Sequence, residues 1–185
     1  YKYLVTYRLG EIIFDLEEQF ESTFLLGTEY RRLREQRFHA ARSGKQCIAE
    51  GVGQSDTSKK GEIKMIGVAK GSYEELLMDN EDFLRQRDLP IWAKDDPRVL
   101  RFRQRARQLS HLSNLGYLGD LKVKPKLPAD PETAGNLMLT LCHMETYLLS
   151  RQIESLEKKF IEEGGFTESL FQRRIEHRKS PKSLR

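Results

Sequence analysis

Cysteine and tryptophan are scarce in this chain of 185 residues, which has two cysteines and one tryptophan. Cys47 and Cys142 are far apart, and no Cys-x-x-Cys pair occurs. Disulfide-stapled scaffolds and structural zinc sites need clustered or regularly spaced cysteines, so both classes are excluded. Because each cysteine lies among apolar residues of a helical pattern, we expect two buried free thiols.

A long apolar run is also missing. No stretch approaches the roughly 20 apolar residues that cross a bilayer. The first residues lack the basic-then-apolar pattern of a secretory signal. We therefore expect a cytoplasmic protein without a membrane partner.

The motifs of common catalytic and cofactor sites are absent as well. No glycine-rich phosphate loop follows a strand pattern, and no Ser/His/Asp arrangement is identifiable. A di-metal helical bundle needs Glu-x-x-His, but the residues three before the four histidines are Gln36, Gln108, Thr140 and Arg174. We predict a protein that is not an enzyme and has no cofactor or metal site, in which His143 is a hydrogen-bonded core histidine.

Apolar residues recur instead at spacings of three, four and seven, the period of helices that bury one face. No strand-like alternation and no internal repeat is found. Asp96-Pro97 and Asp130-Pro131 each have the pattern of a cap followed by proline in the first turn, and Gly164-Gly165 has that of a helix end. Helices are predicted over residues 1–26, 28–51, 57–87, 97–109, 131–163 and 167–178.

Four of these helices are long, and the short basic one lies in a proline-rich stretch before the last long one. This order predicts an all-α fold, an up-down four-helix bundle with a long insertion at about residues 88–130 and a short C-terminal helical suffix. The bundle is expected to form one domain over residues 1–163. Residues 164–185 are predicted to form the suffix and a basic tail, frayed at 180–183.

Glycines set two further expectations. Gly51 and Gly53 fit the left-handed geometry that commonly ends a helix, and the polar run 54–58 supplies a turn and a cap. The third long helix contains three interior glycines, Gly61, Gly67 and Gly71. Each lowers helix stability by about 1 kcal/mol relative to alanine. We therefore expect another backbone to pack closely against this helix. The apolar face of the same helix is widened by Met65, Val68 and Leu76. This extra apolar width predicts self-association.

The formal net charge is only +4, but positive charge gathers on the second helix and on the short helix of the insertion. Arg31, Arg34, Arg42 and Lys45 have offsets close to whole helical turns, so they can share one side. Such clusters bind nucleic acid by neutralising phosphates and releasing counterions. The alternative is that these side chains are solvated or pair with glutamates of neighbouring helices, namely Glu11, Glu18 or Glu75. The candidate nucleic-acid-binding residues are Arg31, Arg32, Arg34, Arg37, Arg42, Lys45, Arg101, Arg103, Arg105 and Arg107.

Two short motifs carry a family resemblance. Residues 48–51 (Ile-Ala-Glu-Gly) and 69–76 (Ala-Lys-Gly-Ser-Tyr-Glu-Glu-Leu) resemble the paired motifs of the 23S rRNA intervening-sequence proteins. The resemblance covers roughly residues 1–87 and the helix near 131–163, and residues 164–168 resemble the suffix of a longer subgroup. The motif residues are Ile48, Ala49, Glu50, Gly51, Gly71, Ser72 and Glu75.

The resemblance implies a four-helix bundle, usually a homopentamer, without enzymatic activity. A related branch, the accessory variability protein of diversity-generating retroelements, binds a reverse transcriptase and nucleic acid. The implied partners are further copies of the chain, RNA or DNA, and a nucleic-acid-processing protein. A protein-interaction scaffold without nucleic-acid contact is the alternative.

The chain departs from this family in two places. Lys45-Gln46-Cys47 stands where the family commonly has Pro-x-Asn, and the 88–130 insertion is longer. Glu50 would lie beside a tight turn, either as an isolated functional carboxylate or as a group that bonds helix-end amides or an arginine.

Overall fold

A computed structural model describes residues 1–111 and 125–179, and these residues form helices and connecting segments without a strand. The all-α prediction is confirmed. None of the described helices combines the length and the apolar character needed to cross a membrane. The helices are α1 (Val5–Phe24), a 3-10 turn (Thr28–Tyr30), α2 (Arg31–Gln54), α3 (Lys59–Arg85), α4 (Pro97–His111), α5 (Pro131–Glu163) and α6 (Phe166–Lys179).

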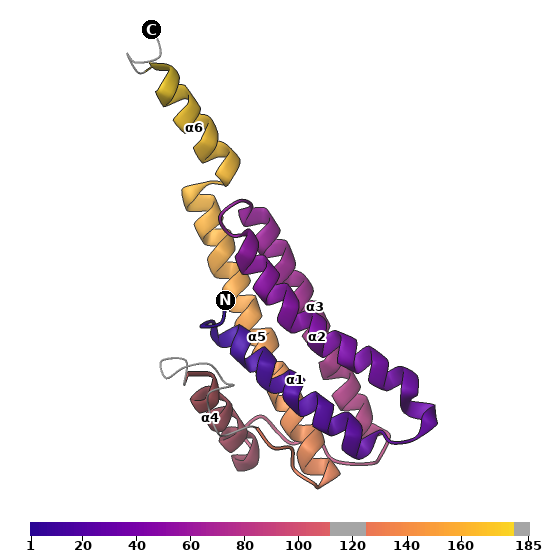
Figure 1. Ribbon diagram of the computed structural model, residues 1–185. Helices are drawn as coiled ribbons and strands as arrows, with labels where there is room; N and C mark the ends of the chain where they lie inside the picture. The colour runs from indigo at the N-terminus through magenta and orange to yellow at the C-terminus, as the bar shows by residue number, and fades with distance from the viewer. Residues whose placement is uncertain (112–124, 180–185) are drawn as a thin grey trace.

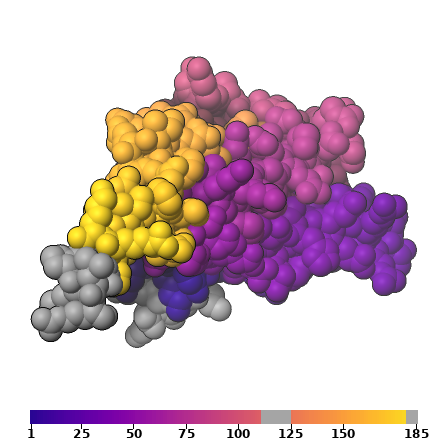
Figure 2. Space-filling view, turned by 90° about the horizontal axis from the view of Figure 1, so that it is seen from above, coloured from indigo at the N-terminus to yellow at the C-terminus, as the bar shows by residue number. Residues whose placement is uncertain are grey.

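Four long helices pack together, with α3 between α2 and α5, and α1 against both α2 and α5 (Figure 1). The short helix α4 lies on α1 and α5 at one side of this group. Helix α6 continues beyond the end of α5 and buries none of its residues. The space-filling view in Figure 2 shows its yellow surface at the front, with no other coloured element covering it.

Several helix ends follow the sequence signals. The Asp130 carboxylate accepts a hydrogen bond from the Thr133 amide at 2.8 Å, and Pro131 begins α5. Ser58 caps α3 by accepting from the Gly61 amide at 3.0 Å. Gly164 ends α5 with φ of 73°, which L side chains rarely adopt. The predicted frayed tail at 180–183 and part of the predicted loop, 112–124, lie outside the described residues.

The prediction that Gly51 and Gly53 end the second helix is wrong. Helix α2 runs through both to Gln54, and neither residue has a positive φ. Gly51 instead permits close packing, because a Cβ there would lie 3.3 Å from the Glu62 carbonyl oxygen of α3. At α6 the Gly165 amide donates to the Glu168 carboxylate, so Thr167 is not the cap.

Tyr73 is fully buried at the centre of the four long helices. Its ring and hydroxyl fill the space that a side chain would need at two glycines. A Cβ on Gly10 of α1 would lie 2.4 Å from the Tyr73 hydroxyl oxygen, and one on Gly44 of α2 would lie 2.6 Å from a ring carbon. Both glycines are therefore required for α1 and α2 to approach α3.

The expected close approach of another backbone to the glycines of α3 is not found among the described residues. A Cβ on Gly67 or Gly71 would meet no atom of the described chain within 4 Å, whereas one on Gly61 would meet Gln54 and Ser58 side chains. No other described helix approaches α3 at Gly67 or Gly71. Of the three residues expected to widen its apolar face, Leu76 is buried, Met65 packs against the core and Val68 is 45% exposed.

The core contains buried thiols and a buried carboxyl group without a hydrogen-bond partner in the described part of the chain. Cys47 and Cys142 are buried free thiols, as predicted. Glu145 is fully buried, and neither of its carboxyl oxygens has a hydrogen-bond partner within the described chain. Burial raises the pKa of Glu145 well above its ordinary value, and burial likewise raises the pKa values of its neighbours Tyr73 and Cys142. Burial therefore favours the neutral form of all three groups.

Substituting alanine at two glycines tests the packing around Tyr73. We expect Gly44→Ala to lower the free energy of unfolding by about 1–3 kcal/mol, because the methyl group collides with the ring. Gly53→Ala is the matched control in the same helix, since a Cβ there would meet no atom of the described chain within 4 Å, and it should gain up to about 1 kcal/mol. Urea unfolding of the two variants checks this, and equal stabilities would contradict the packing.

Glu145 predicts a specific pH dependence of stability. Because its pKa is higher in the folded chain than in the unfolded one, its favourable contribution is complete below about 4.5, its ordinary value. It is then lost as pH rises toward the folded pKa, with a slope of about 1.4 kcal/mol per pH unit. Glu145→Gln should remove this slope. Urea unfolding of both proteins at several pH values is the measurement, and parallel pH profiles would contradict the assignment.

Candidate nucleic-acid interface

Helix α4 is a basic helix held against the apolar surface of α1 and α5. Five of its 15 residues are arginines and none is acidic. Its apolar side is buried through Val99, Ala106 and Leu109. The arginines consequently project from the remaining sides of the helix.

The N-terminus of α4 is fixed by contacts with the preceding segment. The Asp96 carboxylate accepts the Arg98 amide at 2.7 Å and also binds the Arg98 guanidinium, and these hydrogen bonds lower the pKa of Asp96. That guanidinium lies 3.6 Å from the centre of the Trp92 ring, which stacks on Phe102. The Trp92 amide donates in turn to Asn136 of α5 at 2.8 Å. The start of α4 is thereby tied to α5.

The four candidate residues on α4 are not equivalent. Arg101, Arg105 and Arg107 are exposed, whereas Arg103 is half-buried and donates to the Lys94 carbonyl oxygen at 3.2 Å. Arg98, Arg101 and Arg105 are spaced by three and four residues, so they share one side over about 10 Å of helix axis. Because Arg98 is bound by Asp96, the members of this row with no ion-pair partner among the described residues are Arg101 and Arg105, and their guanidinium groups can contact phosphates of one strand.

The basic residues of α2 divide between surface and structural roles. Arg32 and Arg42 are exposed, and Arg31 is exposed but pairs with Glu35 at 3.1 Å. Arg34 donates to the carbonyl oxygens of Leu25 and Gly27, just after the end of α1. Of the residues expected to share one side of this helix, Arg31 and Arg34 thus have partners within the chain, whereas Arg42 is exposed.

Arg37 must be removed from the candidate set because its side chain is 1% exposed. Its guanidinium binds both Glu17 carboxylate oxygens, at 2.5 and 2.9 Å, and the Asn80 side-chain oxygen at 3.0 Å. It also lies 4.7 Å from the centre of the Phe20 ring. Arg37 thus joins α1, α2 and α3 and cannot reach a phosphate.

Carboxyl groups outnumber cations around Arg37. Burial first, and then repulsion by Glu17, raise the pKa of Glu21 to about 7. Burial also raises the pKa of Asp79 on α3, against the attraction of Arg37. Arg37 therefore mainly neutralises Glu17, and Glu21 is partly protonated near neutral pH.

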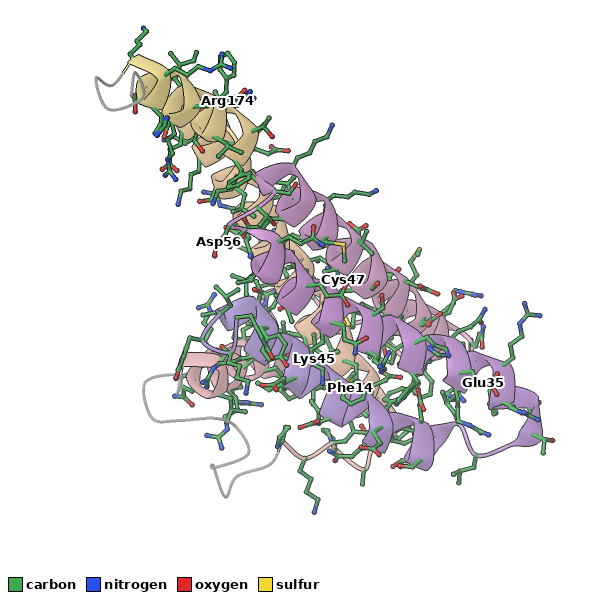
Figure 3. The ribbon with its side chains drawn as sticks, turned by 45° about the horizontal axis from the view of Figure 1, so that its top comes forward. Phe14, Glu35, Lys45, Cys47, Asp56 and Arg174 are labelled. Atoms are coloured by element: carbon green, nitrogen blue, oxygen red, sulfur yellow. The ribbon has the colours of Figure 1, made fainter. Side chains whose placement is uncertain are left out.

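Lys45 lies beside an aromatic pair on the outer side of α1 and α2 (Figure 3). Its ammonium group is 4.3 Å from the centre of the Phe14 ring, and Phe14 contacts Phe38 with ring centres 5.4 Å apart. Phe38 is 37% exposed. A cation beside exposed aromatic rings is the combination on which single-stranded nucleic acids stack.

The exposed cations form two separate clusters. Helix α1 packs against both α2 and α4, and Figure 1 shows those two helices on different sides of it. The exposed residues of α1 include the acidic Asp15 and Glu18. The α2 cluster (Arg31, Arg32, Arg42, Lys45) and the α4 cluster (Arg98, Arg101, Arg105, Arg107) are thus not one continuous basic surface.

Most of the motif residues that carry the family resemblance take part in packing or hydrogen bonding between the helices. Ile48 is buried, Ala49 packs against the core, and Ser72 donates to Ser43 of α2 at 3.3 Å. Gly71 and Glu75 are exposed on α3. Glu50 is exposed within α2 and not beside a turn, which corrects its expected place.

His143 is also exposed, so it is not the core histidine that was predicted. It lies beside Cys142 on α5, but its side chain points away from the apolar stripe. No group of three or more histidine, cysteine or acidic side chains within residues 1–111 and 125–179 could hold a metal ion.

No family model, curated protein or solved structure matches this chain. The family resemblance and the properties that it implies therefore stay predictions.

The residues that sequence reasoning missed are the buried charged ones. Glu17 lies four residues after Ile13 and three before Phe20, and both neighbours are buried on α1. Glu145 similarly lies four residues from Leu141 and from Leu149 on α5. The sequence signal for these buried residues was a carboxylate within an apolar stripe. A helix position three or four residues from buried residues on both sides lies on the same buried face.

Removing Arg37 should destabilise the protein strongly. We expect Arg37→Ala to lower the free energy of unfolding by about 3–5 kcal/mol, since it leaves the Glu17 carboxylate buried without its cation. Arg42→Ala, on the exposed side of the same helix, should change it by no more than about 0.5 kcal/mol. Urea unfolding monitored by circular dichroism compares the two, and similar small losses would show that the buried pair is not structural.

Proposed function

We propose that this protein is a non-catalytic, homo-oligomeric four-helix bundle that binds nucleic acid or a nucleic-acid-processing protein through its arginine-rich surfaces. In this proposal α1, α2, α3 and α5 form an up-down bundle, α4 belongs to an insertion before the fourth long helix, and α6 is a suffix. A homopentamer is the assembly that the family resemblance implies.

The observation that carries the binding proposal is the composition and placement of α4. Its five arginines have no acidic residue among them, and its apolar side is already occupied by α1 and α5. Arg101 and Arg105 are exposed and have no ion-pair partner among the described residues. A rigidly held row of arginines is suited to phosphates, because each contact releases condensed counterions.

The α2 cluster supports the same proposal from the other side of α1. Arg32 and Arg42 are exposed, and Lys45 lies next to the Phe14 and Phe38 rings. Phosphate contacts by the cations and stacking on the rings would act together.

The self-association part rests on the exposed face of α3. Gly67 and Gly71 leave open space above the helix, and Val68 and Met78 are 45% and 58% exposed. Interior glycines lower helix stability unless close packing compensates for them. Packing against another copy of the chain would supply that compensation.

The alternative function is a protein-interaction scaffold without nucleic-acid contact. Helix α6 favours it, because the helix is exposed along its whole length and carries apolar residues. Leu170 and Phe171 are 50% and 62% exposed, and Ile161 at the end of α5 is 82% exposed. Apolar side chains on a projecting helix are suited to docking a partner protein.

Charge reversal on α4 tests the nucleic-acid proposal. We expect the double variant Arg101→Glu/Arg105→Glu to weaken binding to a mixed pool of single- and double-stranded oligonucleotides at low salt. The slope of log affinity against log salt should also fall by roughly 2, because about 0.9 is lost per phosphate contact on B-DNA. Fluorescence anisotropy over a salt series measures both quantities.

The matched control is Arg85→Glu/Arg151→Glu, which changes the net charge equally at two arginines paired with Asp82 and Glu154. It should retain affinity. Equal losses in both double variants would mean that only net charge matters, and absence of binding by the unaltered protein would leave the scaffold alternative. Light scattering with and without the oligonucleotides reports the oligomer, and a monomeric mass would contradict the pentamer.

A further inference from the structure

An apolar cavity of about 220 Å³ lies beneath α4, where this helix meets α1 and α5. The size lies between the roughly 150 Å³ cavity that holds a benzene molecule and the 300 Å³ at which sites for drug-sized ligands begin. Aliphatic side chains of three helices form its walls, namely Ile12, Leu16, Ala106, Leu109, Leu137 and Leu141.

Two cations line the same cavity. Arg105 of α4 and Lys126, on the segment that leads to α5, are exposed residues that border it, and none of its described lining residues is acidic. The cavity therefore combines an apolar interior with positive charge where it meets solvent.

The wall that carries Lys126 is fastened to α1. The Gln19 side chain donates to the Pro125 carbonyl oxygen at 3.1 Å and accepts from the Leu127 amide at 3.0 Å. Leu127 itself is only 7% exposed and belongs to the core. A single side chain of α1 thus satisfies backbone groups on both sides of Lys126 and fixes the position of this residue at the rim.

From this geometry we propose that the cavity binds a small organic anion with an apolar body, of the class of a medium-chain carboxylate. The aliphatic walls accept the hydrocarbon chain, because a cavity lined by leucine and isoleucine does not favour water. Arg105 and Lys126 bind the carboxylate at the rim, where a guanidinium offers paired donors. Arg105 is shared with the proposed phosphate contacts of α4, whereas Lys126 and the aliphatic walls belong to the cavity alone.

Ligand chemistry tests the site without any substitution. Isothermal titration of the full chain compares octanoate with octanol, which lacks the charge, and with butanoate, which lacks most of the chain. We expect octanoate to bind with one site per chain and at least tenfold more tightly than either compound. No binding of octanoate, or equal binding of octanoate and octanol, would overturn the proposal.

Three substitutions then locate the ligand. Arg105→Gln and Lys126→Gln should each weaken octanoate about tenfold and leave octanol unchanged. Ala106→Phe fills the cavity and should abolish binding of both, with folding checked by circular dichroism. Arg151→Gln on the exposed side of α5 is the control and should bind like the unaltered protein. Octanoate binding that survives Ala106→Phe in a folded variant, or that falls equally with Arg151→Gln, would place the ligand elsewhere and overturn the proposal.

Discussion

The buried ion pair between Arg37 and Glu17 is the constraint on which the arrangement of the long helices depends. The pair is 1% exposed on both sides, and Asn80 of α3 completes the hydrogen bonding of the guanidinium. Charges removed from water are tolerated only when their partners are held in fixed geometry. A buried polar contact therefore joins α1, α2 and α3 and disfavours any register that would separate its partners. Tyr73 reinforces it by occupying the space above Gly10 and Gly44.

Helix α4, which packs on the outside of this core, carries the exposed row of arginines and covers the apolar cavity. Helix α4 is fastened at its start by Asp96 and Trp92 and along its length by buried aliphatic residues. One helix consequently presents arginines to solvent on one side and closes an apolar cavity on the other. Rigid support is what makes both roles physically reasonable, since a floating helix would lose entropy on binding any ligand.

Helices α3 and α6 carry exposed surfaces that pack against no other described part of the chain. The open face of α3 at Gly67 and Gly71 and the exposed apolar residues of α6 bury nothing within the described chain. The proposed contacts between protein molecules at these faces and the proposed electrostatic contacts at α4 and α2 would use different residues. An oligomeric nucleic-acid binder and a protein scaffold are thus compatible with one fold, and they differ in whether the arginines meet phosphates.

Local signals in the sequence determined the helical class, the start of α5 at Asp130-Pro131, its end at Gly164 and the short basic helix at Pro97. Capping and periodicity act over a few residues, so one sequence suffices to find them. Only the tertiary structure decided which arginines are surface groups, because Arg37 and Arg42 look alike along the chain. Their difference comes from Glu17 and Asn80, which lie 20 and 43 residues away from Arg37. The same holds for Gly51 and for the cavity beneath α4, since each is formed by elements that meet only in the folded protein.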